Sequence, residues 1–403
     1  MFSKVTVYLK AASGLLLILG LLSGCQHFSR SSDGAAAVSG EKSTLTTTTT
    51  NNMTVTRPIP SAFNLVPRGI DYSTPPEIVA FSSCANQDAP QPLWSVIQKH
   101  NPDLFIFDGD IVYATSPEQR PVAEQYKKLS KIPEYRAFRE AVPVMAMWDD
   151  NDSGKNDGGA DNPEKDLYKK EFLKHFPYIK DSISWNQGGL YHVKYIGGNT
   201  TTNPGRRRKQ RILKKQPLLQ VIMLDTRYFR SPLKKADDPQ NPLHIYDPWD
   251  EKDATKMVLG EEQWLWLDDQ LQRPADLRII VSGIQVIAKD HGFEKWANFP
   301  TERQRLFDLI KKHGARNTLI ISGDRHIGTI AKADISGFGP LFDVTASSIN
   351  RPSQLEEKDA TYIGKPIQAE NFGLAFIDWK KRRIKVELRD LQDQVGNSVD
   401  FKF

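Results

Sequence analysis

The sequence predicts an α/β fold for the chain from about residue 66 onward. Short apolar runs alternate there with amphipathic stretches, a pattern typical of strands that alternate with helices. Several of the apolar runs end at clusters of Cys, Asp, Asn, Gln or His. Hydrophobic residues make up 39% of the 403 residues, which is enough to bury a sizeable core. These observations favour one large globular domain over residues 66–403.

Six of the apolar runs are expected to be strands. They are residues 78–81, 104–107, 142–147, 218–224, 278–281 and 318–321. Helices are expected at residues 93–99 and 261–271. In the second helix Trp264, Leu267 and Leu271 fall on one face, because an α-helix turns once every 3.6 residues. This order of strands and helices is the one expected of an α/β domain.

Polar side chains of the types that bind metals follow the expected strands at their carboxyl ends. Each of them alone has an ordinary explanation: Asp110 could cap a helix, Asp150 could belong to a turn, and His326 could be a surface histidine. Ligands of α/β sheets collect just beyond the carboxyl ends of the strands. Because six strand ends in one chain carry such residues, the sequence favours one shared metal site.

The motifs at these strand ends are themselves specific. In chain order they are FSSC (81–84), DGDIVY (108–113), WDDND (148–152), LDTR (224–227), GEEQ (260–263), GIQ (283–285) and GDRH (323–326). In this combination the chain resembles the PhoD-like (alkaline phosphatase D) family over about residues 84–350. The resemblance implies a metallophosphoesterase-like sandwich of two mixed β-sheets flanked by helices. It also implies metal-dependent hydrolysis of phosphate mono- or diesters.

The resemblance assigns metal-ligand roles to individual residues. They are Cys84, Asp110, Tyr113, Asp150, Asp324 and His326. Asp110 would bridge two cations in a binuclear or larger site. The family implies Fe³⁺ with Ca²⁺, and the residue types agree, because thiolate and phenolate suit ferric iron whereas carboxylates suit a hard cation. Taken alone, Cys84 would be read as a small buried hydrophobe.

The chain departs from the family at Asn151, where many relatives have His. An amide donates a hydrogen bond but cannot supply a proton near neutral pH. Either activity is reduced or another group acts as the acid, so Asn151, Asp152 and Arg325 are the expected catalytic residues, with Lys155 and His291 as further candidates. The alternative function is a catalytically weak envelope protein that binds phosphorylated polymers or lipids.

The N-terminus is expected to be a targeting signal. Lys4 and Lys10 precede an apolar run at residues 11–22 that is too short to span a bilayer. The run ends in LSGC (22–25), which resembles the bacterial lipobox, so residues 1–24 are expected to be a lipoprotein signal peptide and Cys25 to be lipidated. An ordinary secretory signal with a chance cysteine is the alternative.

The residues after Cys25 suggest a location and a tether. Gln26 favours sorting to the outer membrane, so the protein is expected in the bacterial cell envelope, lipid-anchored, at the outer membrane or facing the periplasm. Residues 25–65 are low in apolar content and contain an unbroken threonine run, as in a flexible tether. The catalytic domain would then span residues 66–403.

The formal net charge of +5 is unevenly distributed, with a basic cluster at residues 206–215. The cluster is either a solvated loop or a patch that faces anionic lipid, polyphosphate or nucleic acid. No base-reading motif or interleaved aromatic pattern accompanies it, so nucleic acid is not an expected partner. The expected partners are a phosphate ester substrate and the membrane.

Overall fold

The computed structural model of the chain describes residues 65–198, 216–238 and 240–403. The predicted signal peptide, Cys25, nearly all of the predicted tether and the whole basic cluster lie outside these residues, so these features stay predictions. The described residues belong to one compact unit, Pro60–Phe403. Across these three ranges, no helix is both long enough and apolar enough to cross a membrane.

The first of two six-stranded sheets has the strand order β14-β13-β12-β1-β2-β3. Its strands are β1 (Ile78–Ser82), β2 (Leu104–Asp108), β3 (Val144–Met147), β12 (Asn371–Asp378), β13 (Arg383–Asp390) and β14 (Val395–Lys402). The pairs β1–β2 and β2–β3 are parallel, whereas β12, β13 and β14 are joined by antiparallel pairs. The carboxyl ends of β1, β2 and β3 therefore lie at one edge of this sheet.

The second sheet has the order β10-β11-β9-β8-β5-β4. Its strands are β4 (His192–Gly197), β5 (Leu218–Met223), β8 (Leu277–Ser282), β9 (Thr318–Ser322), β10 (Gly328–Ile335) and β11 (Gly339–Ala346). The four central strands are parallel, and the edge strands β4 and β10 run antiparallel to their neighbours. A two-stranded ribbon of β6 (Lys234–Lys235) and β7 (Tyr246–Asp247) lies apart from both sheets.

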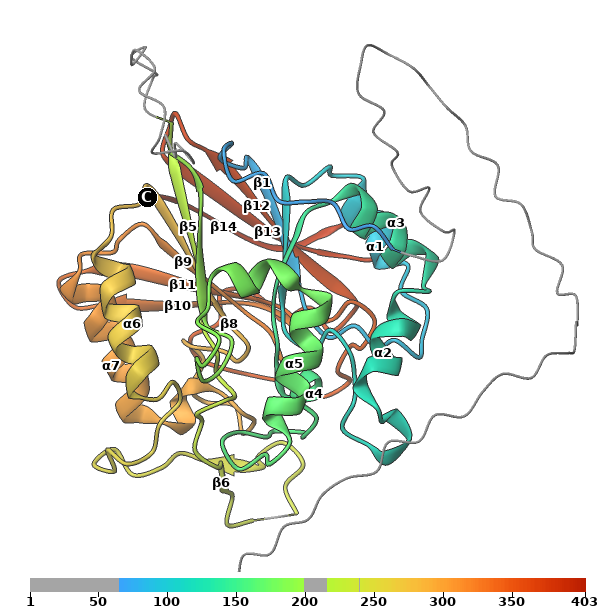
Figure 1. Cartoon of the computed structure of the whole chain (residues 1–403). Helices are drawn as coiled ribbons and strands as arrows, with labels where there is room; N and C mark the ends of the chain where they lie inside the picture. The colour runs from blue at the N-terminus through green and yellow to red at the C-terminus, as the bar shows by residue number, and fades with distance from the viewer. Residues whose placement is uncertain (1–64, 199–215, 239) are drawn as a thin grey trace, which may run out of the picture. The chain divides into compact units, whose positions relative to one another are not determined.

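Helices cover the outer faces of the two sheets. They are α1 (Leu93–Gln98), α2 (Val122–Leu129), α3 (Pro133–Ala141), α5 (Lys165–His175), α6 (Glu261–Gln272) and α7 (Pro300–Lys312), whereas the short α4 (Asp150–Ser153) lies just beyond the end of β3. Figure 1 shows α6 and α7 on one side of the strands and α1, α2, α3 and α5 on the other. The predicted fold, two packed mixed sheets with flanking helices, is confirmed.

The core follows the two-residue period of the strands. In β5, Leu219 and Val221 join the cluster that also holds the strands of the first sheet, whereas Ile222 joins a second cluster beneath α6 and α7. Trp264 and Leu267 are buried in that second cluster, as the helical period predicted. Each such side chain, when fully buried, stabilises the fold by about 1.5–3 kcal/mol.

All six predicted strands and both predicted helices are present. Their ends differ by one or two residues from the predicted ends. The largest shift is in β3, which was expected from residue 142 and begins at Val144. The intervening Pro143 has no backbone N–H to donate to a neighbouring strand, although its carbonyl still accepts a hydrogen bond from Phe105.

Candidate metal centre

The candidate centre forms where the carboxyl ends of both sheets meet. Cys84 follows β1, Asp110 follows β2, and Asp150 is the first residue of α4, just beyond β3. Asp324 and His326 follow β9 of the second sheet. Four of the six strand ends that the sequence predicted to share one site, those of β1, β2, β3 and β9, supply these residues, whereas the ends of β5 and β8 supply none of the candidate ligands.

Two glycines allow the strand ends to approach this closely. A Cβ added at Gly109, whose φ is +114°, would lie 2.5 Å from the Cβ of Asp149. A Cβ added at Gly323 would lie 2.6 Å from Oγ of Ser83, on the other sheet. Neither position has room for a side chain, so Gly109 allows the ends of β2 and β3 to approach each other, whereas Gly323 allows the two sheets to approach each other.

The backbone is strained at the candidate ligands. Eight non-glycine residues among the described ones have a positive φ, and five of them lie in this centre: Cys84 (61°), Asp110 (51°), Asp157 (49°), Asp324 (69°) and His326 (59°). Each such conformation costs about 1–3 kcal/mol and persists only where the surrounding structure enforces it. Their concentration at one place is the backbone signature of a functional site.

The first donor group consists of Cys84, Asp110, Tyr113 and His326. Ligand atoms of Cys84, Asp110 and His326 all lie within 4.8 Å of one another. The Tyr113 hydroxyl donates to Oδ2 of Asp110 at 3.3 Å and lies 3.2 Å from Nε2 of His326. Sγ of Cys84 lies 3.6 Å from the same Asp110 oxygen. Sulfur, phenol, carboxylate and imidazole donors thus surround a single point.

The second donor group consists of Asp150, Asp157 and Asp324, whose ligand oxygens also lie within 4.8 Å of one another. A further set with the same spacing, made of Asp110, Asp149 and Asp150, connects the two donor groups. Asp110 therefore belongs to the first group and to the connecting set, which is the position that a bridging ligand would need.

The charges of Asp110 and Asp324 are poorly compensated by the protein itself. Burial, and then the charge of Asp150, raises the pKa of Asp110 well above its usual range. Burial and the same neighbour raise the pKa of Asp324 well above its usual range too. Burial, and then Asp110, likewise raises the pKa of the Cys84 thiol. Cations would offset the desolvation and repulsion of these groups, so the residues fit a polynuclear metal site.

A buried arginine network supports the second donor group. Nη2 of Arg227 lies 2.8 Å from Oδ2 of Asp149, and Nη1 lies 2.6 Å from Oε2 of Glu294. Arg230 contacts the other Glu294 oxygen at 2.8 Å. Arg227 also lies 3.7 Å from Oδ1 of Asp324. Arg227 already forms an ion pair with both carboxylate oxygens of Asp149. Asp149 is therefore better placed to hold Arg227 beside the second donor group than to bind a cation.

Asn151 touches carboxylates of both donor groups. Its side-chain Nδ2 donates to Oδ2 of Asp110 at 2.9 Å and lies 3.1 Å from Oδ1 of Asp150. Its backbone N–H contacts the same two carboxylates. The residue that departs from the family pattern therefore lies inside the centre, where its amide can donate hydrogen bonds to oxygens.

Asp152 has the contacts of a positioning residue. Its carboxylate accepts hydrogen bonds from the backbone N–H groups of Ile111 (3.0 Å), Val112 (3.1 Å) and Asp149 (3.0 Å). Burial raises its pKa to about 7, although these hydrogen bonds act in the opposite direction. Its oxygens thus hold the segment after β2 and the start of α4, and its catalytic role stays a prediction.

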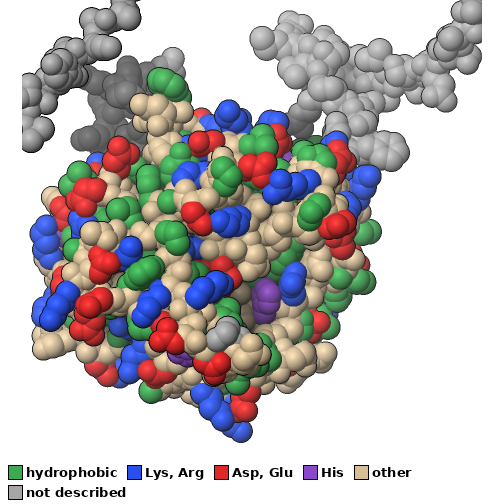
Figure 2. Space-filling view, turned by 90° about the horizontal axis from the view of Figure 1, so that it is seen from below, with side chains coloured by type: hydrophobic (Ala, Val, Ile, Leu, Met, Phe, Trp, Pro, Cys, Tyr) green, Lys and Arg blue, Asp and Glu red, His purple; other side chains and the backbone are tan. Residues whose placement is uncertain are grey.

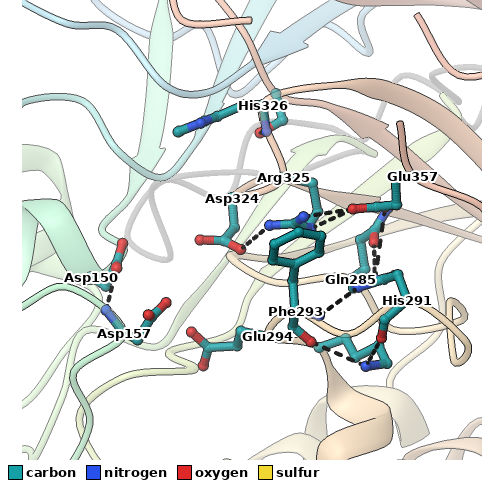
Figure 3. A network of polar contacts seen from close by, with 12 residues as sticks. Asp150, Asp157, Gln285, His291, Phe293, Glu294, Asp324, Arg325, His326 and Glu357 are labelled. Carbon is teal, nitrogen blue, oxygen red and sulfur yellow. Dashed lines mark hydrogen bonds and ion pairs between the residues drawn. The ribbon is translucent and has the colours of Figure 1, made fainter. Parts of the chain in front are cut away.

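Arg325 is also engaged by neighbours. Figure 3 shows its guanidinium against the Phe293 ring and the Glu357 carboxylate. Nη2 lies 2.6 Å from Oε2 of Glu357, the ring centroid is 4.0 Å from Cζ, and Asp324 is 3.7 Å from Nη1. These contacts fix the GDRH segment, and the catalytic role of Arg325 stays a prediction.

The other two candidate acids are likewise occupied. His291 is buried, and its Nε2 lies 2.8 Å from Oε1 of Gln285. Burial lowers the pKa of His291 well below its usual value, so the imidazole is neutral near neutral pH. Lys155 forms an ion pair with Asp161. Neither residue belongs to the two donor groups.

Asp157 is the candidate ligand that sequence reasoning missed. Its backbone N–H donates to Oδ2 of Asp150 at 2.6 Å, and its own carboxylate accepts a hydrogen bond from the Tyr246 hydroxyl at 2.6 Å. The only local signal is an acidic residue in a glycine-containing segment soon after the WDDND motif. Tyr246 comes from β7, far along the chain, so no spacing rule connects the two residues.

The chain is similar in sequence to known phosphatases. Residues 195–392 match the model of the PhoD-like phosphatase family. The matched range includes Asp324 and His326 but not Cys84 or Asp110. Alkaline phosphatase D of Bacillus subtilis (strain 168) is 21% identical over 321 residues, which cover 69% of this chain and 49% of that protein. The chain thus spans about half the length of this curated relative.

Solved structures share the fold. A structure of PhoD matches with a TM-score of 0.60 and 15% identity, covering 83% of this chain and 70% of the other. A dimetal phosphatase from Danio rerio matches with a TM-score of 0.50 and 11% identity, over 82% of this chain and all of the other. A purple acid phosphatase from yellow lupin gives the same score and identity over 82% and 55%.

Proposed function

We propose, on the premise that the chain carries a PhoD-like phosphatase domain, that it hydrolyses phosphate mono- or diesters with cations held at the candidate metal centre. The observation that carries this proposal is the position of Asp110. Its carboxylate lies within ligand distance of the first donor group and of the carboxylates that lead to the second. A shared carboxylate between two cation positions is the arrangement that phosphoryl chemistry with two metals requires.

The two donor groups differ in the cation they suit. Cys84 and Tyr113 would supply thiolate and phenolate, which suit Fe³⁺, whereas the second donor group offers only carboxylates, which suit Ca²⁺. When bound, the cations would neutralise phosphate oxygens and make a bound water more acidic. We therefore assign iron to the first donor group and calcium to the second.

The protein's own residues would position the ligands of the centre and restrict which leaving groups can depart. The Asn151 amide donates to Asp110 and Asp150 and cannot deliver a proton. Asp152 and Arg325 hold the segments that carry the ligands. Esters whose leaving group departs without a proton, such as aryl esters, are therefore the substrates expected to turn over best.

We further propose that the enzyme acts outside the cytoplasm, anchored through lipidated Cys25. The support is the LSGC segment after a short apolar run. Mass spectrometry of the membrane-bound mature protein tests this proposal and is expected to find acyl chains on Cys25. Cys25→Ala should release the protein from membranes or block its processing. An unmodified Cys25 in the membrane-bound mature protein would contradict the proposal.

The test of the activity begins with metal analysis of the purified protein. Turnover of p-nitrophenyl phosphate and bis(p-nitrophenyl) phosphate is then measured before chelation, after chelation and after restoration of the metals. Turnover should disappear with the metals and return with them. A protein that is fully loaded with metal, turns over neither ester and still binds phosphorylated polymers would instead have the alternative function of a binding protein in the envelope.

A further inference from the structure

Arg351 is an exposed arginine at the edge of the candidate metal centre. Its Cζ lies 4.2 Å from the centroid of the Tyr113 ring. Its charge acts on Tyr113 and on His326, two members of the first donor group. Figure 2, a view from below, shows basic and histidine side chains around a hollow in the surface. A cation in this position is available to an anion that enters the centre from solvent.

The Arg351 guanidinium differs from the other arginines near the centre. Arg227 and Arg230 are buried and paired with carboxylates, and Arg325 is paired with Glu357. Among residues 65–198, 216–238 and 240–403, Arg351 makes one hydrogen bond, from its backbone N–H to Ser348, and its guanidinium pairs with no carboxylate. Its five N–H donors are therefore free for a ligand.

The backbone around Arg351 is held firmly although its side chain is exposed. The preceding residue, Asn350, accepts a hydrogen bond from the backbone N–H of Asn86 at 2.7 Å and donates to the carbonyl of the same residue at 2.9 Å. Two residues later, the N–H of Ser353 donates to the carbonyl of His326 at 2.8 Å. The segment is thus attached to both sheets beside the centre, which limits the entropy lost when the guanidinium binds a ligand.

We propose that Arg351 binds a non-bridging oxygen of the substrate phosphate and thereby favours phosphate monoesters over diesters. A guanidinium presents a planar fork that matches phosphate oxygens, and such charge-assisted hydrogen bonds are stronger than neutral ones. A monoester carries more negative charge and one more non-bridging oxygen than a diester. This inference rests on the proposed function, because it assigns a substrate class to the same centre.

The experiment compares three variants loaded with metal to the same level as the wild type. Arg351→Ala removes the cation and Arg351→Lys keeps the charge without the fork. Arg305→Ala is the matched control, because Arg305 also lies over an aromatic ring, 4.6 Å from the Trp264 centroid, but on α7. The measurements are kcat/KM for p-nitrophenyl phosphate and bis(p-nitrophenyl) phosphate, and the Kd of inorganic phosphate by calorimetry.

Arg351→Ala should lower kcat/KM for the monoester about 10- to 100-fold and for the diester much less. The affinity of Arg351→Ala for inorganic phosphate should fall as well. Arg351→Lys should retain part of the monoester kcat/KM and part of the phosphate affinity. Arg305→Ala should match the wild type in both measurements. Equal effects on both esters with unchanged phosphate affinity would overturn the inference. Loss of metal in Arg351→Ala but not in Arg351→Lys would overturn it too, because Arg351 would then support Tyr113 rather than substrate.

Failure of the proposed function gives a different result. In that case the fully loaded wild type turns over neither ester, and the esters no longer report on Arg351. The phosphate calorimetry then decides alone: weaker binding by Arg351→Ala supports the assignment of Arg351 to phosphate, and unchanged binding refutes it.

Discussion

The two donor groups of the centre are built in different ways. The first holds its donors by contacts among themselves, since the Tyr113 hydroxyl and the Cys84 thiol both approach the Asp110 carboxylate. The second consists only of carboxylates, which are held by the backbone N–H groups of Asp157 and Asn151 and by the network around Arg227. We therefore expect the types of donor atom to determine which cation binds to the first group. In the second group, we expect the surrounding network to determine how stably the carboxylates are held.

The largest effect is expected from Asp110→Asn, because Asp110 belongs to the first donor group and to the set that connects it to the second. The amide removes a negative charge from both cation positions, so kcat/KM should fall by at least about 1,000-fold with loss of metal from both groups. Elemental analysis and ester hydrolysis measure this. The control is Asp400→Asn, an exposed residue paired with Arg383. Wild-type metal content and rate in Asp110→Asn would remove Asp110 from the centre.

Arg227→Ala tests the support of the second donor group. The substitution leaves the buried Asp149 without its arginine partner and leaves Glu294 paired with Arg230 alone, so the free energy of unfolding should fall by about 3–5 kcal/mol. Urea unfolding of the metal-free protein measures it. The control is Arg383→Ala, which breaks an exposed pair with Asp400 and should cost about 0–1 kcal/mol. If the two variants lose similar stability, the buried network does not support the centre as described.

Cys84→Ser tests the donors of the first group. An alcohol is a far poorer anionic ligand than a thiolate, so iron content should fall while the calcium of the second group is retained. Iron bound by the Tyr113 phenolate should also give the wild type a visible charge-transfer absorption, which Tyr113→Phe should abolish. Full activity in a protein that carries zinc alone would rule out the iron assignment.

The smallest effect is expected at the junction of the groups, from Asn151→His. An imidazole could protonate a leaving group, which matters for an alkyl diester and little for a nitrophenyl diester. Turnover of the alkyl diester should therefore rise about tenfold relative to the nitrophenyl diester. Metal occupancy must be equal in both proteins, because the amide of Asn151 contacts Asp110 and Asp150. If both rates fall alike with the metals intact, Asn151 is itself the adapted residue.

The sequence predicted the part of the fold that positions the centre, because buried parallel strands are continuous apolar runs and their ends carry motif residues. It did not predict the strands from β10 to β14. In β14, exposed and half-exposed residues alternate without a buried face, so its sequence has no clear hydrophobic period. Such an edge strand is specified mainly by its pairing with β13.

For the centre, the residues next to strand ends could be predicted, whereas those that reach it from distant segments could not. The pair of Arg227 with Glu294 joins residues 67 positions apart, and the Asp157–Tyr246 hydrogen bond joins residues 89 positions apart. No periodicity connects them. Arg351 does not belong to any of the motifs at the strand ends. Its place at the centre could not be predicted, because it depends on the contact between its guanidinium and the Tyr113 ring.

Cys84, Asp110, Asp324 and His326 have left-handed backbone conformations, which lower the stability of the fold, but their side chains supply the donor atoms of the centre. Glycine would adopt these conformations without a Cβ penalty, so selection for thermal resistance alone would favour glycine at each of the four positions. Every such replacement would remove a donor atom. The side chains at these positions are therefore kept at a cost in stability, and a redesign that optimised stability alone would replace these candidate metal ligands first.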